Sequence, residues 1–237
     1  MTDIIAGIPA RLGSKRLPGK VLLELNGQPI LWHVWKAAAE SLGRDNVFVC
    51  SEDEEILGIA RDFGAKTFKN ERVARNGTER MHELSSATGA REIINIQGDD
   101  PTLNSQAITE LVLEKMTEHE ILTPIFKIPE DVDLYNPSLV KVVTDNEANA
   151  IYFSRSLIPH PRDDLSVEAW GHVGLYRYTT KALETYMQGG EAYAEKIEKL
   201  EQLRFLALGV KIGTIVTEFV PSPIDTPKDL DELNGRA

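Results

Sequence analysis

The first hundred residues alternate between short apolar runs and longer segments with helical periodicity, and this alternation limits the possible fold more than any other feature. Strands separated by helices form a parallel sheet with right-handed crossovers. In the second half, two runs at hairpin distance predict an antiparallel pair. We therefore expect an α/β fold, with a mostly parallel sheet flanked by helices and an antiparallel insertion. The apolar runs of the first half are residues 4–8, 47–50, 66–68 and 93–96, the helices there include 29–42 and 56–63, and the antiparallel pair is 140–143 with 150–153.

Further elements follow from the same periodicities. The chain has 237 residues, enough for one large or two small domains, and we expect a single domain over residues 1–237. The remaining predictions are helices at 105–119, 180–187 and 196–208 and strands at 21–25, 121–128, 173–178 and 210–219.

A glycine-rich basic loop follows the first apolar run, which stops at Pro9. Glycines allow sharp turns and a close approach of backbone N–H groups, and arginine and lysine supply charge-assisted donors. A strand that leads into such a loop is a general way to hold a polyphosphate. A solvated surface loop is the alternative interpretation. The cations are Arg11, Lys15, Arg16 and Lys20, interleaved with Gly13, Pro18 and Gly19.

Two familiar phosphate-binding motifs are excluded. A Walker loop has four residues between its glycines, whereas five residues separate Gly13 from Gly19, and Val21 follows Lys20 where serine or threonine is needed. The chain also contains no Gly-x-Gly-x-x-Gly dinucleotide fingerprint.

Two other polar stretches lie beside predicted strand ends. Asn76-Gly77 is a turn signal, and Thr78 is expected to cap the helix that carries Arg80. Asp99 and Asp100 follow a buried strand, where carboxylates suit a hard cation such as Mg²⁺, although Gly-Asp-Asp-Pro is also good turn chemistry. Because ligands bind beyond the carboxyl ends of parallel strands, the basic loop and these aspartates should reach one crevice.

Composition narrows the functional classes. Hydrophobic residues make up 42% and charged residues 27% of the chain, and 26 cations against 37 anions give a net charge of −11. This charge argues against general binding to nucleic acid or to an anionic membrane. Cys50 is the only cysteine, so no internal disulfide forms, and we expect an inert core thiol in a cytoplasmic protein. No signal-peptide pattern or membrane-spanning run is present in the sequence.

The second half offers weaker signals. Glu201 and Gln202 lie on an amphipathic segment that is either a solvated helix or one that faces a polar substrate. His172 stands alone before a strand, where a structural role is the commoner one. Asp225 or Thr226 is a natural N-cap for a terminal helix, and a pairing of Asp225 with Asp99 does not follow from spacing.

Taken together, these residues resemble the sugar-acid cytidylyltransferases, over nearly the whole chain. The second half is similar to the CMP-KDO synthetase branch, the 3-deoxy-manno-octulosonate cytidylyltransferases. The first-half motifs are Ile8-Pro9-Ala10-Arg11-Leu12-Gly13-Ser14, Arg16-Leu17-Pro18-Gly19-Lys20, Gly77-Thr78-Glu79-Arg80 and Gln97-Gly98-Asp99. The second-half motifs include Tyr152-Phe153-Ser154-Arg155, His172-Val173-Gly174-Leu175-Tyr176, Leu200-Glu201-Gln202-Leu203-Arg204 and Asp225-Thr226-Pro227.

The resemblance implies a Rossmann-like, GT-A-like nucleotidyltransferase fold and an Mg²⁺-dependent reaction. The anomeric hydroxyl of KDO or a KDO-like acid would attack the α-phosphorus of CTP, pyrophosphate would leave, and the product would serve lipopolysaccharide biosynthesis. It also implies a homodimer, with residues of roughly 135–180 as a smaller sugar-binding and dimerisation subdomain. The implied nucleotide-binding residues are Ala10, Arg11, Ser14, Lys20, Arg80 and Gln97, of which Arg11 and Lys20, with Asp99, would be catalytic. The implied sugar-binding residues are Arg155, His172, Glu201 and Gln202, and the implied metal ligands are Asp99 and Asp225.

The chain departs from the family pattern near these sites. Ala74 and Asn76 stand where the family usually has histidine and serine, and Cys50-Ser51-Glu52-Asp53 replaces the usual Ala-Thr-Asp-Asp. Alternatives therefore stay open. They are a cytidylyltransferase for another sugar acid, such as a nonulosonic acid, a nucleotide-binding protein without turnover, and a GT-A-type glycosyltransferase.

Overall fold

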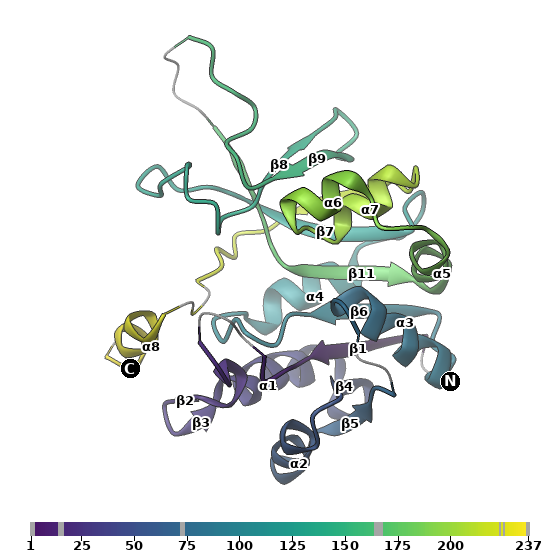
Figure 1. Cartoon of the computed structure of the whole chain (residues 1–237), viewed down its shortest axis with the longest axis vertical. Helices are drawn as coiled ribbons and strands as arrows, with labels where there is room; N and C mark the ends of the chain where they lie inside the picture. The colour runs from purple at the N-terminus through teal and green to yellow at the C-terminus, as the bar shows by residue number, and fades with distance from the viewer. Residues whose placement is uncertain are drawn as a thin grey trace.

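The computed structural model describes residues 3–13, 17–71, 74–163, 168–222, 224 and 226–235. Within these residues a ten-stranded sheet runs through the centre of the molecule in the order β5-β4-β1-β6-β11-β7-β10-β8-β9, and β12 also pairs with β7. Figure 1 shows the helices arranged around this sheet and α8, at the C-terminal end, beside the β2–β3 hairpin.

The first half of the chain forms the parallel part of the sheet, as predicted. β1 pairs in parallel with β4 and β6, and β4 with β5. The carboxyl ends of these strands therefore meet at one edge. The strands are β1 (Ile4–Pro9), β4 (Val47–Ser51), β5 (Lys66–Lys69) and β6 (Glu92–Ile96), and the helices between them are α1 (Ile30–Leu42), α2 (Glu54–Asp62) and α3 (Gly77–Thr88).

The second half extends the sheet with antiparallel strands. β11 runs antiparallel to both β6 and β7, and β8 pairs antiparallel with β9, so the predicted antiparallel insertion is confirmed. β12 pairs with β7 in parallel. The strands are β7 (Ile121–Lys127), β8 (Lys141–Thr144), β9 (Ala150–Ser154), β10 (Trp170–His172), β11 (Leu175–Thr179) and β12 (Ile212–Val216). The helices are α4 (Ser105–Leu113), α5 (Thr180–Gln188), α6 (Tyr193–Glu198), α7 (Gln202–Ala207) and α8 (Pro227–Asn234).

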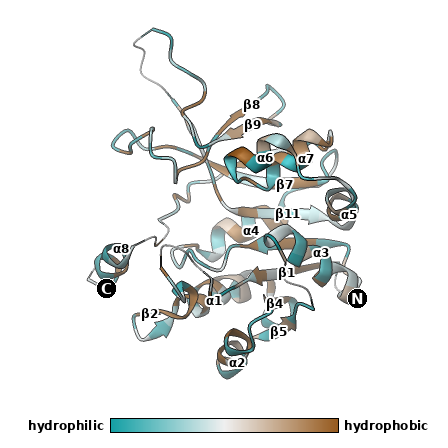
Figure 2. Cartoon of the chain, viewed as in Figure 1, coloured by the Kyte–Doolittle hydropathy of each residue, from teal (hydrophilic) through white to brown (hydrophobic). Residues whose placement is uncertain are grey.

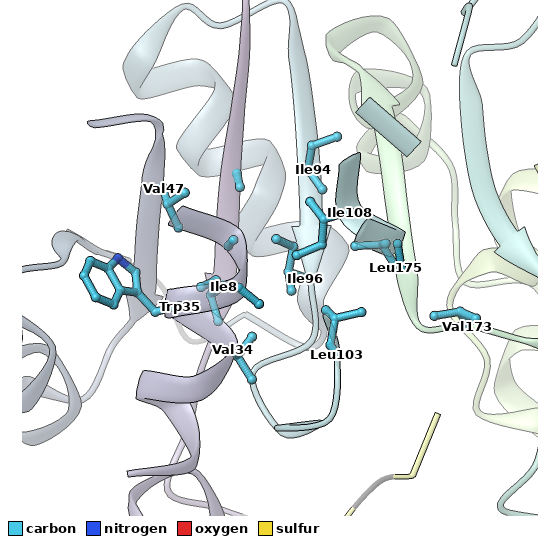
Figure 3. Close-up of a cluster of buried hydrophobic side chains, with 14 of the residues drawn as sticks. Ile8, Val34, Trp35, Val47, Ile94, Ile96, Leu103, Ile108, Val173 and Leu175 are labelled. Atoms are coloured by element: carbon cyan, nitrogen blue, oxygen red, sulfur yellow. The ribbon is translucent and has the colours of Figure 1, made fainter. Parts of the chain in front are cut away.

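Two hydrophobic cores hold the layers together. One core joins side chains of α1 and α4 to the central strands, as in Figure 3, where Val34 and Ile108 lie near Ile8 and Ile96. The other joins α3, α5 and α7 to the same sheet through residues such as Met81. Figure 2 shows hydrophobic residues along β1 and β7, which have core on both faces. Strands with two buried faces read as continuous apolar runs, so they were the easiest to predict.

Some expected elements differ from the structure. Residues 20–22 form a 3₁₀ helix, and the strand expected at 21–25 shrinks to β2 (Glu24–Leu25), which turns at Asn26-Gly27 into β3 (Gln28–Pro29). The helix expected to reach residue 119 ends at Leu113. The strand expected at 173–178 is β11 (Leu175–Thr179), and β10 (Trp170–His172) is a short strand before it that was not predicted.

The expected helix 196–208 is two helices, because Lys199 adopts a left-handed conformation with φ 55° between α6 and α7. Such a conformation in a non-glycine residue interrupts the α-helical backbone, which changes direction there. The break places Glu201 directly before α7 and makes Gln202 the first residue of that helix.

Candidate active site

The end of β4 fastens the start of the basic loop. The carboxylate of Asp53 accepts a hydrogen bond from the backbone N–H of Leu12 at 3.1 Å, and the Ser51 hydroxyl donates to the Ala10 carbonyl at 2.9 Å. Asp53 is also the N-cap residue of α2 but makes no side-chain cap bond there, and its carboxylate holds the loop across two adjacent strand ends.

A buried ion pair lies beside this loop. The Arg80 guanidinium donates to the Glu52 carboxylate through Nη2 at 2.7 Å and Nε at 3.2 Å, and only 4% of the Arg80 side chain is exposed. Two parallel N–H···O bonds fix the plane of the guanidinium. Glu52, one of the departures from the family pattern, therefore orients Arg80.

The helix α3 begins differently from the prediction. Thr78 was expected to be its N-cap, but Asn76 takes this role, because its side-chain oxygen accepts a hydrogen bond from the Glu79 N–H at 3.0 Å. The Thr78 N–H instead donates to Glu201 at 3.0 Å. Between them, Gly77 has no side chain, and a Cβ there would lie 3.2 Å from the Asn95 amide nitrogen. The missing Cβ lets β6 and the Glu201 carboxylate approach the turn closely.

These elements enclose a cavity of about 480 Å³, the α3 cavity. It brings together Ala10, Arg11, Arg80, Gln97 and Glu201, five of the predicted site residues. Its charged lining is mixed in sign, and several of the charges are already paired within the protein. The full lining is Pro9, Ala10, Arg11, Arg75, Asn76, Gly77, Arg80, Gln97, Glu191, Glu195, Lys199, Glu201 and Arg204.

Lys20 and Asp99 form an ion pair at the edge of the sheet where the carboxyl ends of the parallel strands meet. The Lys20 ammonium lies 3.0 Å from the Asp99 carboxylate, whose side chain is 51% exposed while that of Lys20 is 5% exposed. The two segments can approach because Gly98 has no side chain, since a Cβ there would lie 2.9 Å from the Pro9 carbonyl oxygen. The neighbouring Asp100 is directed away into a bond with the Thr102 hydroxyl, and burial raises its pKa.

A second cavity of about 670 Å³ lies on the other side of Gln97, and we call it the His172 cavity. Gln97 lines both cavities, so the two meet there. Its walls come from the ends of β6 and β10, the loop before β8 and the segment after β12. The lining is Gln97, Asp99, Asp100, Phe126, Val132, Asn136, Ser138, Leu139, Val140, His172, Gly174, Val220, Pro221, Ser222, Thr226 and Asp229.

His172 is a neutral group in this cavity. Burial lowers the pKa of its imidazole to about 3. Its Nε2 lies 3.0 Å from the Thr123 hydroxyl, which donates its own hydrogen to the Leu175 carbonyl at 2.8 Å. With the hydroxyl hydrogen so used, we assign the proton of the imidazole to Nε2. Nδ1 is then left as a hydrogen-bond acceptor.

Glu201 and Gln202 differ in their surroundings. Glu201 lines the α3 cavity, and burial raises the pKa of its carboxyl. Gln202 is 2% exposed, and its Nε2 has no hydrogen-bond partner among the described residues. A buried amide donor without a partner costs about 1–3 kcal/mol.

Arg155 does not line either cavity. Its guanidinium donates to the main-chain carbonyls of Glu198 at 2.7 Å and Pro137 at 2.9 Å. Arg155 thus ties the end of α6 to the loop that borders the His172 cavity. Lys141, which the sequence did not single out for a role, holds the same loop through the carbonyls of Asn136 and Leu139.

Two predicted site residues, Ser14 and Asp225, lie outside the described residues. Thr226, the residue after Asp225, lines the His172 cavity and caps α8 through a bond from the Asp229 N–H at 3.3 Å. Among the described residues, no three histidine, cysteine or acidic side chains form a metal-binding group.

Sequence reasoning missed three further groups at the site. Glu52, Tyr186 and Glu195 gave no local signal, because each is defined by a partner far along the chain or by burial. The α3 N-cap was detectable, since asparagine before glycine at a helix start is a strong cap. Cys50 is buried, as expected, and burial raises the pKa of its thiol.

Comparison with known proteins defines the class. Residues 5–212 match the family model described as cytidylyltransferase, so the chain belongs to the cytidylyltransferase family. The family expected from the sequence motifs is thereby confirmed. The fold prediction of a nucleotidyltransferase α/β sheet is confirmed as well.

Particular relatives are similar over nearly their whole length. The chain is 37% identical over 235 residues to an 8-amino-3,8-dideoxy-manno-octulosonate cytidylyltransferase of Shewanella pealeana, covering 97% of this chain and 96% of that protein. A solved structure of CMP:2-keto-3-deoxy-manno-octonic acid synthetase complexed with CTP is 33% identical and superimposes with a TM-score of 0.91, covering 99% and 98%. A cytidylyltransferase structure from Leptospira borgpetersenii, 19% identical with a TM-score of 0.67 and coverage of 99% and 86%, shares the fold.

Among the helices in the described residues, none combines the length and the hydrophobicity that a bilayer crossing requires.

Proposed function

We propose that the chain couples CTP to the anomeric hydroxyl of a KDO-type sugar acid. The anomeric oxygen would bond to the α-phosphorus, the bond from that phosphorus to the β-phosphate oxygen would break, and pyrophosphate would leave while the hydroxyl proton passes to solvent. The observation that carries the proposal is the pair of cavities that meet at Gln97, beside Lys20 and Asp99. Two substrates can thus approach each other from opposite sides of one charged centre.

The α3 cavity is proposed to hold the nucleotide. Arg11 is exposed at its wall, at the start of the basic loop, and Arg80 is oriented beside it by the ion pair with Glu52. Lys20 is placed to stabilise negative charge on the phosphates. Preorganised charges of this kind are the main resource of phosphoryl-type transfer, which needs no covalent nucleophile.

We propose that Mg²⁺ is held by Asp99 and Asp225. The donor set fits, because Mg²⁺ prefers oxygen ligands and usually takes one or two carboxylates together with phosphates and waters. Asp99 is half exposed at the strand edge, and Thr226 of the segment that contains Asp225 borders the same cavity. When bound, the metal would neutralise charge on the phosphates. The Asp99 carboxylate lies 3.0 Å from the Lys20 ammonium, and this ion pair holds the carboxylate in place.

The His172 cavity is proposed to receive the sugar acid. Glu201, which lines the α3 cavity, and Gln202, which lines neither cavity, are proposed to assist from the start of α7. His172 Nδ1 suits a sugar hydroxyl, and the buried Gln202 amide lacks a partner that a sugar oxygen could supply. Arg155 is proposed to act here by holding the loop and the α6 end.

Of the KDO-type acids, we propose that the 8-amino acid is preferred. The Shewanella pealeana relative, 37% identical, carries that name, and the His172 cavity offers the Asp229 carboxylate for an ammonium group. A carboxylate close to an ammonium is a charge-assisted contact that a neutral hydroxyl cannot equal.

Pyrophosphate release tests this function. The purified chain is mixed with CTP, Mg²⁺ and, in separate reactions, KDO, 8-amino-KDO or a nonulosonic acid. We expect turnover with both KDO-type acids and a kcat/KM about tenfold higher for the amino acid, which corresponds to ~1.4 kcal/mol. Turnover with the nonulosonic acid alone would contradict the proposal, and so would CTP binding without turnover of any acid.

We also propose a homodimer formed through residues 135–180 and the adjacent α6. The edge strand β9 exposes Ile151 to 59%, and α6 exposes Ile197 to 64%. An exposed edge strand with apolar side chains favours pairing with a second copy. Light scattering should give twice the chain mass, and Ile151→Glu should reduce it to one chain mass.

A further inference from the structure

We infer that Asn76 is a positioning residue that couples the α3 cavity to helices α6 and α7. The inference deepens the proposed function, because α7 begins with Glu201 and Gln202, which are proposed to serve the sugar acid. It rests on a continuous set of side-chain hydrogen bonds that runs from the wall of the α3 cavity to α7.

Asn76 uses both ends of its amide. Its Oδ1 accepts the Glu79 N–H at 3.0 Å and so caps α3, while its Nδ2 donates to the Tyr186 hydroxyl at 2.6 Å. Asn76 also lines the α3 cavity, so a ligand there touches the residue that makes both bonds. The cap alone needs only the oxygen. The bond to Tyr186 is therefore a separate function of the side chain.

The connection continues through buried groups. The Tyr186 hydroxyl donates to Glu195 at 3.2 Å, and Tyr186 has no exposed surface. Glu195 in turn accepts two bonds from Arg204, at 2.7 Å and 2.5 Å, and the Arg204 guanidinium lies 3.9 Å from the Tyr186 ring centroid. One network thus joins the cap of α3 to α5, α6 and α7, and in Figure 1 these helices lie along the same side of the sheet.

A second hydrogen bond joins the turn at 76–78 to the residue before α7. The Thr78 N–H donates to Glu201, the residue directly before α7, so the turn at 76–78 contacts both Tyr186 and Glu201. If a nucleotide in the α3 cavity fixes this turn, it also fixes the place of Glu201. Two ligands that each order the same element bind with positive coupling, and the coupling is reciprocal.

The substitution Asn76→Ser separates the two roles of Asn76. A serine hydroxyl still caps the helix, but it is too short to reach Tyr186. Tyr186→Phe removes this bond together with the bond from the Tyr186 hydroxyl to Glu195, and it keeps the ring under Arg204. Tyr193→Phe is the matched control, since Tyr193 also lies in this region but is 82% exposed.

Hydrogen exchange of the backbone amides in α6 and α7, with and without CTP, tests the coupling. We expect CTP to slow this exchange at least fivefold in the wild type and in Tyr193→Phe. In Asn76→Ser and Tyr186→Phe, each measured at a CTP concentration that saturates it, we expect less than twofold slowing, and the double variant should behave like either single one. In turnover, KM for the sugar acid should rise about tenfold while kcat changes less than threefold.

Unchanged CTP-dependent protection in Asn76→Ser, no protection in the wild type, or additive losses in the double variant would each overturn the inference. The exchange readout needs only the nucleotide. If no sugar acid is turned over, the proposed function fails, and the coupling is still decided by the exchange data.

Discussion

The two cavities that meet at Gln97 are built in different ways. The α3 cavity is framed by buried ion pairs, Arg80–Glu52 and Arg204–Glu195, in which both arginines are almost fully enclosed. The His172 cavity is framed by loop residues with exposed apolar side chains, such as Val132 and Val220, and by the half-exposed Asp99.

This difference suggests that the two cavities bind different substrates. Charges that are fixed before a ligand arrives cost no reorganisation during the reaction, which suits the highly charged triphosphate. A wall of loops and apolar side chains can accommodate variation in the ligand, which suits a sugar acid.

The largest expected effect on kcat is in the His172 cavity, at Asp99. Asp99→Asn should lower kcat by about 10²- to 10³-fold, because the proposed metal contact and the partner of Lys20 are lost together. EDTA should abolish activity, and added Mg²⁺ or Mn²⁺ should restore it.

The control for this variant is Asp100→Asn. Asp100 is adjacent in the chain but is bonded to Thr102, so its loss should lower kcat less than tenfold. Equal effects of the two substitutions, or full activity in EDTA, would count against a metal at Asp99.

In the α3 cavity, the expected effect of a substitution is on the stability of the fold. Arg204→Met leaves the Glu195 carboxylate buried without its ion partner, so the free energy of unfolding in urea should fall by about 3–5 kcal/mol. The double variant Arg204→Met, Glu195→Met should recover most of this loss, since an apolar pair has no unpaired charge. A loss below 1 kcal/mol for Arg204→Met would show that the ion pair does not hold this cavity together.

Gln202 tests whether the start of α7 contributes to binding of the sugar acid. Gln202→Ala should raise KM for the sugar acid about tenfold, or ~1.4 kcal/mol, because the free amide donor is then absent. KM for CTP should change less than threefold. Kinetic measurement of both constants decides this, and equal changes in the two would remove Gln202 from the sugar site.

The smallest effect concerns pH and His172. Its pKa of about 3 in the folded state lies below the ordinary value near 6.5, so between these values the unfolded chain binds a proton that the folded chain does not. Stability contributed by the neutral ring is therefore lost as pH falls below about 6.5. Because the ring borders the cavity and water weakens the effect, we expect the wild type to lose about 1 kcal/mol more than His172→Gln between pH 7 and pH 5. Parallel urea titrations of the two proteins measure this difference, and identical losses would mean that His172 is not kept neutral by burial.

The sequence was most informative where structure is local. β1, α1 and β4 were predicted because buried strands and amphipathic helices have characteristic periods. Their order then placed the strand ends, and so Lys20 and Asp99, at one edge.

The α3 cavity was less predictable from the sequence, because its hydrogen bonds and ion pairs join residues that are far apart in the chain. Glu52 and Arg80 are 28 residues apart, and Asn76 and Tyr186 are 110 apart. The break at Lys199 has no glycine or proline to mark it. The contacts on either side of it come from distant residues, since Arg155 donates to the Glu198 carbonyl and Arg204 donates to Glu195.

A crystal structure of the chain with CTP and Mg²⁺ tests most directly whether the α3 cavity binds the nucleotide and the His172 cavity the second substrate. The account predicts the cytosine in the α3 cavity beside Ala10 and Arg80, with the phosphates extending along the basic loop to Lys20 and the His172 cavity left for the second substrate. Density for the cytosine in the His172 cavity, or a triphosphate remote from Lys20, would contradict it.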